Sequence, residues 1–414
     1  MPSQFGWIDF AEEDRQRMLD VVHLFRERDT RDELGIGTIR DAFSDYFFPG
    51  TSTIQTKARY MLFIPWMYMD LERREVPSAT IAGKARAKEI RLISALLEGG
   101  QKEGVIGVEA KKSLKRLPSS IYWTGLSSWG IRMFNGSQDQ YHRYLDKYYI
   151  RSKAGFGKEL DEEFSDSTKA PNWHPGLPKP PHDLMNKASL NLTAEEAVYL
   201  RDQVLNRHPD SLLAAFIRKG KKYKVRFPWE HPVVGSLSTD LQNDVAHAKN
   251  FSGVIHGTSL LYNLMLSEAI KKEEWVEDYN RRLREWAEAL HPRLRTLGDW
   301  HRNVMDFWNS GALKNARIPL QTKRFVNRWL DFVFVFPGPD KLPEDDSVRS
   351  VIVSREVFLK RNRARLKSRR ALELWQGESG TAQLSYRWAT ANTFIADIFE
   401  RMKEGRRLAR SKHT

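Results

Sequence analysis

The chain has 414 residues, of which 41% are hydrophobic and 29% charged, so it has room for two or three folded domains and is too hydrophobic for a disordered chain. It contains no cysteine, which excludes disulfides, thiolate zinc sites, iron–sulfur clusters and a cysteine nucleophile, and favours a reducing compartment. The formal net charge is +14, and a field of this sign attracts polyanions, nucleic acid first among them.

The beginning of the chain predicts a cytoplasmic protein. Acidic Asp9, Glu12 and Glu13 stand where a secretory signal would have a basic start followed by an apolar stretch. The longest apolar run, residues 61–69, is nine residues with Pro65 inside it, about half of the ~20 that span a bilayer. We therefore expect no contact with a membrane and expect this run to be a buried helix.

Residues 1–151 predict an N-terminal helical domain. Asp9 with Glu12 suits the start of a helix over residues 10–28. Thr38 predicts the start of a second helix that ends at Pro49 and Gly50, and Ser52 with Gln55 resembles the capping box of a third. The second and third helices would then form a tight hairpin. Farther along, the spacing of residues 137 and 140 predicts another helix start.

The rest of the chain predicts a linker and two further helical regions. Residues 152–189 are rich in Pro and Gly and are typical of a linker. Thr193 with Glu196 restarts helical structure, followed by long helices over 240–267 and 273–290, while the apolar run 330–336 fits either a strand or a helix end. We expect a mainly α fold with two helical lobes joined by the Pro/Gly-rich segment and little β structure. The expected parts are 1–151, 152–189, a Trp-rich 190–350 and a basic 351–414.

Positive charge gathers near the end of the chain. Residues 351–414 contain fifteen Lys and Arg against six Asp and Glu. As one helix, residues 355–370 would carry charge on most sides and only a narrow stripe of Leu359 and Leu366. Such a helix either contacts phosphates or is a solvated basic face relieved by neighbours such as Glu356, and we prefer the first reading. The predicted contacts are Lys360, Arg361, Arg363, Arg365, Lys367, Arg369 and Arg370.

The predicted hairpin over residues 38–59 is a second candidate for nucleic-acid binding. Gln55, Lys57 and Arg59 would lie at the start of its second helix, where a helix-turn-helix module presents short polar and basic side chains to base edges and phosphates. The alternative is an ordinary pair of core helices, which the apolar run behind the hairpin favours.

No complete catalytic motif occurs in the sequence. His247 and Lys249 match the first half of a phospholipase D type signature, but Val254 occupies the position that requires Asp, and His256 would lie on the opposite side of a continuous helix. Glu109 follows the apolar residues 105–108 as in half of a restriction-type nuclease site, without an obvious partner carboxylate. Phosphate-binding glycine loops are missing as well. We expect no catalytic residue, metal ligand or cofactor.

Several segments along nearly the whole chain resemble an uncharacterised bacterial family that is known only as a domain of unknown function. They are Arg-Asp-Glu-Leu-Gly-Ile-Gly at 31–37, Arg-Asp at 40–41, Phe-Pro-Gly-Thr-Ser-Thr-Ile-Gln-Thr at 48–56, 59–60, 65–66, 122–130, 256–263, and 386–388 with Asp397. The resemblance implies a place in antiphage defence islands, beside a helicase and a phospholipase D-like nuclease, as in the system called Azaca. It implies no catalytic residue for this chain.

Three functions follow as hypotheses. The preferred one is a non-catalytic subunit of a bacterial antiphage defence complex that binds nucleic acid, with DNA expected, and acts with helicase and nuclease partners. The second is a scaffold or sensor that binds partner subunits through a tryptophan-rich helical surface, with Trp275, Trp286, Trp300, Trp308 and Trp329. The third is a metal-dependent nuclease that uses Glu109.

Overall fold

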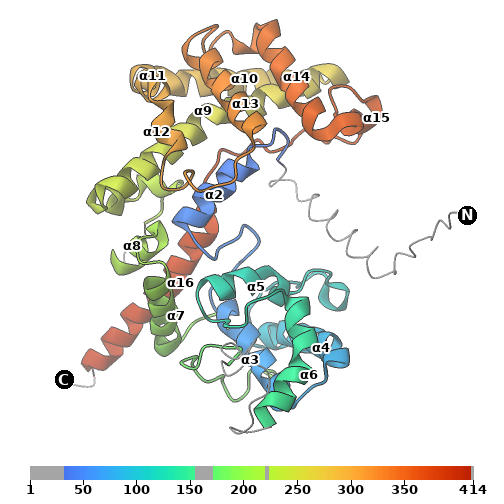
Figure 1. Ribbon diagram of the computed structural model, residues 1–414, viewed down its shortest axis with the longest axis vertical. Coiled ribbons are helices and arrows are strands. Elements are labelled where there is room, and N and C mark those ends of the chain that lie inside the picture. The colour runs from blue at the N-terminus through green and yellow to red at the C-terminus, as the bar shows by residue number, and fades with distance from the viewer. Residues whose placement is uncertain (1–31, 154–170, 220–222, 412–414) are drawn as a thin grey trace, which may run out of the picture. The chain divides into compact units, whose positions relative to one another are not determined.

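The computed structural model describes residues 32–153, 171–219 and 223–411, and the helix expected over residues 10–28 lies outside them. In these ranges the chain is mainly helical and forms no strand, and an isolated antiparallel bridge joins Arg132 to Trp173 (Figure 1). The predicted mainly α fold is therefore confirmed. None of the helices described combines the length and apolar character that a membrane span requires.

The chain forms two compact units, each built from segments far apart in the sequence. The first contains the described residues up to Phe43 together with Thr239–Leu384, and the second contains Ser44–Ser238 together with the residues from Ser385 onward. The division differs from the sequential domains that the sequence suggested. Side-chain packing decides which helices share a core, and a linker-like composition carries no information about that pairing.

The first unit is organised around one long helix. Its helices are α2 (Gly37–Phe47, shared with the second unit), α9 (Thr239–Ile270), α10 (Glu273–Leu290), α11 (Leu294–Arg302), α12 (Val304–Trp308), α13 (Leu320–Phe334), α14 (Asp346–Lys360) and α15 (Arg369–Glu373), with 3₁₀ turns η5 (His291–Arg293), η6 (Leu342–Glu344) and η7 (Arg361–Arg363). The helices expected over 240–267 and 273–290 are α9 and α10, and the run 330–336 includes the end of α13.

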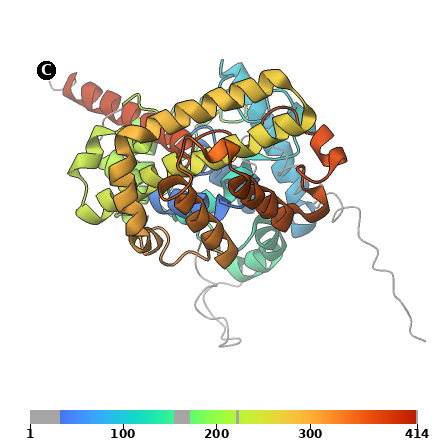
Figure 2. The same ribbon diagram turned by 90° about the horizontal axis from the view of Figure 1, so that it is seen from above.

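Helix α9 is buried on most sides because α10, α13, α14 and α15 pack on it, and Figures 1 and 2 show α10 beside it. The indole N–H of Trp286 on α10 donates to the carbonyl of Gly253, and that of Trp329 on α13 donates to the carbonyl of Val254. Gly257 is needed at the crossing, since a Cβ there would lie 2.5 Å from the Trp286 ring. Indole donors satisfied in this way can be buried without cost to hydrogen bonding.

The second unit surrounds the apolar run at residues 61–69. Its helices are α3 (Tyr60–Arg73), α4 (Ser78–Glu98), α5 (Pro118–Ser128), α6 (Gln138–Lys153), α7 (Ala194–Arg207), α8 (Leu212–Lys219) and α16 (Trp388–Ser411), with 3₁₀ turns η1 (Lys111–Ser113), η3 (Pro228–Glu230) and η4 (Pro232–Ser236). The apolar run forms most of α3 and is almost entirely buried, as predicted. Helices α4 and α5 pack on α3, and α16 packs on α7 and α8.

Two of the predicted helix starts have the expected geometry and one is wrong. The Ser137 and Gln140 side chains each accept the other residue's backbone N–H, and Thr193 and Glu196 form the same capping box. Gln55 also accepts the N–H of Ser52, but no helix begins there, and α3 starts only at Tyr60. The intervening residues instead form turns whose hydrogen bonds go to α5 and α16, so no tight helical hairpin exists.

The described part of the Pro/Gly-rich segment is packed into the second unit. Trp173 is buried and donates its indole N–H to Glu72, and the carbonyl of Pro178 accepts the indole N–H of Trp66. Leu184 and Ala188 are also buried. Residues 171–189 therefore serve as an extended core element and not as a free tether between domains.

Candidate functional site

The basic segment near the C-terminus is not one helix. Helix α14 ends at Lys360, Arg361 has a positive φ of 50°, and a short 3₁₀ turn and an irregular stretch precede α15. We call residues 361–370 the basic turn. The prediction of a continuous helix over residues 355–370 is wrong because a buried carboxylate satisfies the backbone of this segment in a different conformation.

That carboxylate belongs to Glu356 on α14, which is fully buried. It accepts the backbone N–H groups of Arg365 at 2.9 Å and Leu366 at 3.0 Å, together with the hydroxyl of Tyr262 at 2.5 Å. Two successive N–H groups directed at one carboxylate hold the chain in a turn, and a buried charge with this many donors is well stabilised. Glu356 is thus the anchor of the basic turn and not a neighbour that relieves surface repulsion.

Two of the predicted contact residues form ion pairs within the first unit. Lys360 pairs with Glu33 and with Glu356, and Arg365 pairs with Glu33 at 3.0 Å. Burial would raise the pKa of the Glu33 carboxyl, but the two cations outweigh it and the net shift is downward. Lys360 and Arg365 are therefore not available to a phosphate backbone. Glu33 had no predicted role, although it lies in the first of the segments that carry the family resemblance.

The other five predicted contacts of the basic turn lie at the surface. They are Arg361, Arg363, Lys367, Arg369 and Arg370. Arg369 pairs with Glu373 at 3.2 Å while remaining 93% exposed, and a pair this exposed contributes little. No Asp or Glu of the described residues lies within ion-pairing distance of the other four. Five exposed cations therefore share one short surface segment that Glu356 anchors.

The residues predicted to read nucleic acid from the hairpin are placed inside the second unit. Arg59 is buried and forms a 2.6 Å ion pair with Glu196, which is also buried. Gln55 is buried as well and donates to the carbonyl of Gly50. Lys57 pairs with Asp397 at 3.2 Å. Gln55 and Arg59 are buried and cannot reach base edges, and the partly exposed Lys57 is held by Asp397, so the predicted helix-turn-helix contacts at these positions are corrected to structural roles.

The residues considered for catalysis have ordinary structural environments. His247 accepts the indole N–H of Trp300 at 2.9 Å, and burial lowers its pKa, while a ring nitrogen of His256 lies 2.9 Å from the carbonyl of Thr381. Glu109 is exposed, and the residues before it form turns where a nuclease site would need a strand. Within the described ranges, no group of three or more His, Asp or Glu side chains is arranged to hold a metal ion.

Most of the tryptophans proposed as a partner surface belong to the core of the first unit. Trp286, Trp300, Trp308 and Trp329 are buried, and each donates its indole N–H inside that unit. Trp275 is half-buried against Trp375, with ring centroids 5.2 Å apart. A side chain already packed in a core offers no area to a partner, so these positions do not form the predicted tryptophan-rich surface.

Comparison with known proteins assigns the chain to a family but gives no activity. No curated protein matches the sequence, and no solved structure matches the fold. One family model matches residues 2–401, which is nearly the whole chain. The chain therefore belongs to DUF6361, a family of unknown function.

Proposed function

We propose that this chain is a non-catalytic nucleic-acid-binding subunit of a bacterial antiphage defence complex, and that the basic turn is its main contact with the phosphate backbone. The observation that carries the proposal is the exposure of Arg361, Arg363, Lys367, Arg369 and Arg370 on one segment anchored by Glu356. Clustered cations displace condensed counterions from a phosphate backbone, and this release supplies much of the binding free energy.

The anchoring of the turn supports a binding role over a merely solvated one. A cationic segment that is ordered before binding loses less conformational entropy on contact than a free tail does. The neighbouring Phe358 and Leu374 are also exposed, at 60% and 75%. Apolar side chains next to cations suit contact with bases and sugars, which a purely solvated basic face does not need.

The defence context and the partners come from the family resemblance described above. That resemblance supports neighbours which unwind and cut nucleic acid, and this chain carries neither kind of motif. In such a complex the chain would hold nucleic acid while a helicase and a phospholipase D-like nuclease act on it. We expect the complex to be cytoplasmic and its nucleic acid to be DNA.

The test measures binding of the full chain to labelled duplex and single-stranded DNA by fluorescence anisotropy at several salt concentrations. Five phosphate contacts predict a slope of log K against log salt of about −4.5 on duplex DNA, or a loss of about 500-fold between roughly 50 and 200 mM salt. Reversing three charges, Arg363→Glu, Arg369→Glu and Arg370→Glu, should reduce the slope to about −1.8 and greatly weaken binding.

A matched control reverses three exposed cations elsewhere in the first unit, Arg284→Glu, Lys314→Glu and Lys341→Glu. It changes the net charge equally, so it reports the effect of the overall field alone. The proposal requires the control to bind much more tightly than the variant of the basic turn. Equal weakening by both variants, or binding that does not depend on salt, would contradict it.

A further inference from the structure

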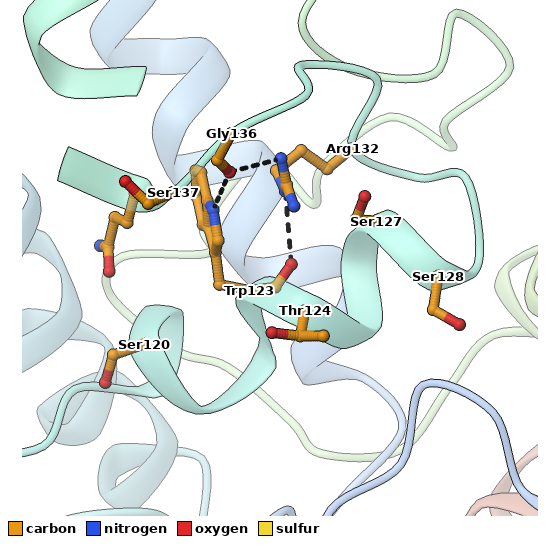
Figure 3. Close-up of a pocket in the computed structure, with 9 residues that line it drawn as sticks. Ser120, Trp123, Thr124, Ser127, Ser128, Arg132, Gly136 and Ser137 are labelled. Atoms are coloured by element: carbon orange, nitrogen blue, oxygen red, sulfur yellow. Dashed lines mark hydrogen bonds between the residues drawn. The ribbon is translucent and has the colours of Figure 1, made fainter. Parts of the chain in front are cut away.

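An open pocket of about 590 Å³ lies in the second unit, between α5 and the first turn of α6. The loop of residues 129–137 joins these helices and supplies part of its wall. Figure 3 shows the side chains around it, among them Trp123, Thr124, Ser127, Arg132 and Ser137. The lining is rich in hydroxyl groups and contains one cation but no carboxylate.

The cation is Arg132, which is only 6% exposed. Its Nε donates to the carbonyl of Trp123 at 3.3 Å, and its Nη1 donates to the carbonyls of Phe134 and Gly136. The guanidinium also lies over the Trp123 ring, 4.7 Å from a ring centroid. These contacts hold the guanidinium in one orientation while neutralising none of its charge.

No acidic side chain of the described residues is paired with Arg132. Burial lowers the pKa of its guanidinium, and no neighbouring carboxylate counteracts this. Arginine nevertheless stays protonated in proteins, so the site keeps a positive charge that is almost removed from water. A buried charge without a counterion is costly, and an anion bound in the pocket would supply that counterion.

The guanidinium has donors left for a ligand. Its three hydrogen bonds use Nε and Nη1, so neither N–H of Nη2 has an acceptor in the described part of the chain. Thr124 and Ser127 lie three residues apart on the same face of α5, and both line the pocket. Their hydroxyl groups have no protein partner among the described residues either.

The ends of the two helices add to this electrostatic preference. Helix α6 is 16 residues long, and its capping residue Ser137 and first residue Gln138 line the pocket, so its N-terminal end faces the pocket; Asp139 in the same turn is exposed and pairs with Arg143. The negative end of α5 is neutralised, because the carbonyls of Leu126 and Ser127 accept the N–H groups of Ile131 and Gly130. The pocket therefore has donors on several sides and few free acceptors.

We propose that this pocket binds a phosphate group, with Nη2 of Arg132 and the hydroxyls of Thr124 and Ser127 as its hydrogen-bond donors. Donors that approach from α5 and from the connecting loop, beside the N-terminus of α6, suit the spread oxygens of a tetrahedral anion better than a planar carboxylate. The phosphate can belong to a small molecule or to the end of a nucleic-acid strand. The proposal does not depend on the basic turn, which belongs to the other unit.

The test measures phosphate binding by isothermal titration calorimetry at constant ionic strength, using the full chain with the triple charge reversal in the basic turn. The ligands are inorganic phosphate, a nucleoside monophosphate, and one oligonucleotide with either a 5′-phosphate or a 5′-hydroxyl end. The expected result is saturable binding of phosphate-bearing ligands at millimolar concentration or below. Tighter binding of the 5′-phosphorylated strand than of the small ligands assigns the site to a strand end. Binding of the small ligands at least as tight as that of the strand assigns it to a small molecule.

Thr124→Glu places a carboxylate at the mouth of the pocket, at an exposed position where it should not disturb folding. It should weaken phosphate binding at least about tenfold through like-charge repulsion. Thr80→Glu, at an exposed position on α4 outside the pocket lining, is the charge-matched control and should bind like its parent. Absence of saturable binding by the parent, or binding that Thr124→Glu leaves unchanged, overturns the proposal.

Discussion

Glu356 should stabilise the first unit by several kilocalories per mole, because its buried carboxylate accepts hydrogen bonds from the backbone of the basic turn. Glu356→Gln keeps the shape of the side chain but replaces one acceptor oxygen by an NH₂ donor. In its least damaging orientation this group faces the N–H of Leu366, which now lies 3.0 Å from the carboxylate. The variant also removes the negative charge that lies 3.2 Å from Lys360.

The expected loss of stability follows from these two changes. A buried N–H group left without an acceptor costs about 1–3 kcal/mol, and breaking a buried ion pair costs about 3–5 kcal/mol. Because Lys360 keeps its second partner, Glu33, we expect the lower end of the summed cost, about 4 kcal/mol. Urea denaturation followed by far-UV circular dichroism measures it.

Glu373→Gln is the matched control. Glu373 and Arg369 form a pair with the same spacing of four residues as Glu356 and Lys360, but both side chains are exposed. Exposed pairs of this kind contribute about 0.3–0.5 kcal/mol. A difference of less than about 1 kcal/mol between the two variants would refute the argument that burial of Glu356 anchors the turn.

Two further predictions concern buried positions, one in each unit. Burial raises the pKa of Glu89 to about 7, although Ser119 donates two hydrogen bonds to its carboxylate. Between about pH 4.5 and 7 the unfolded chain loses this proton before the folded chain does, so the contribution of Glu89 to stability should fall as pH rises. In thermal unfolding, the parent should therefore lose stability relative to Glu89→Gln across this range. In α9, Gly257→Ala should lower the melting temperature through its clash with Trp286, costing about 1–3 kcal/mol. At Gly253 an added Cβ would make only an ordinary contact with Arg293 at 3.9 Å, so Gly253→Ala should stabilise the helix by up to about 1 kcal/mol and raise the melting temperature. Equal effects of the two substitutions would contradict the packing argument.

Local sequence signals predicted much of the secondary structure. The capping pairs at Ser137 and Thr193 act within one helical turn, so they can be read without knowing the fold, and the long helices expected over 240–267 and 273–290 are α9 and α10. The same local logic was wrong at Ser52. There the capping hydrogen bond forms, but the backbone N–H groups of Thr56 and Ala58 donate to Tyr122 and Asp397, and these tertiary hydrogen bonds hold the residues in turns.

The amino-acid composition predicted the candidate site only in part. It located the cations near the C-terminus, but it could not separate Lys360 and Arg365, which pair with Glu33 more than 300 residues away in sequence, from the five that remain exposed. Nor could it find the pocket around Arg132, whose defining property is the lack of a carboxylate partner.

The amino-acid sequence by itself determined the helical class, the absence of cysteine chemistry and the strongly positive charge, because each depends on residue types or on neighbours along the chain. Only the tertiary structure decided which charged side chains form ion pairs inside the protein and which remain exposed to a ligand. The physical reason is that an ion pair depends on distances of a few ångströms between side chains, and these distances exist only after segments far apart in the sequence have packed together.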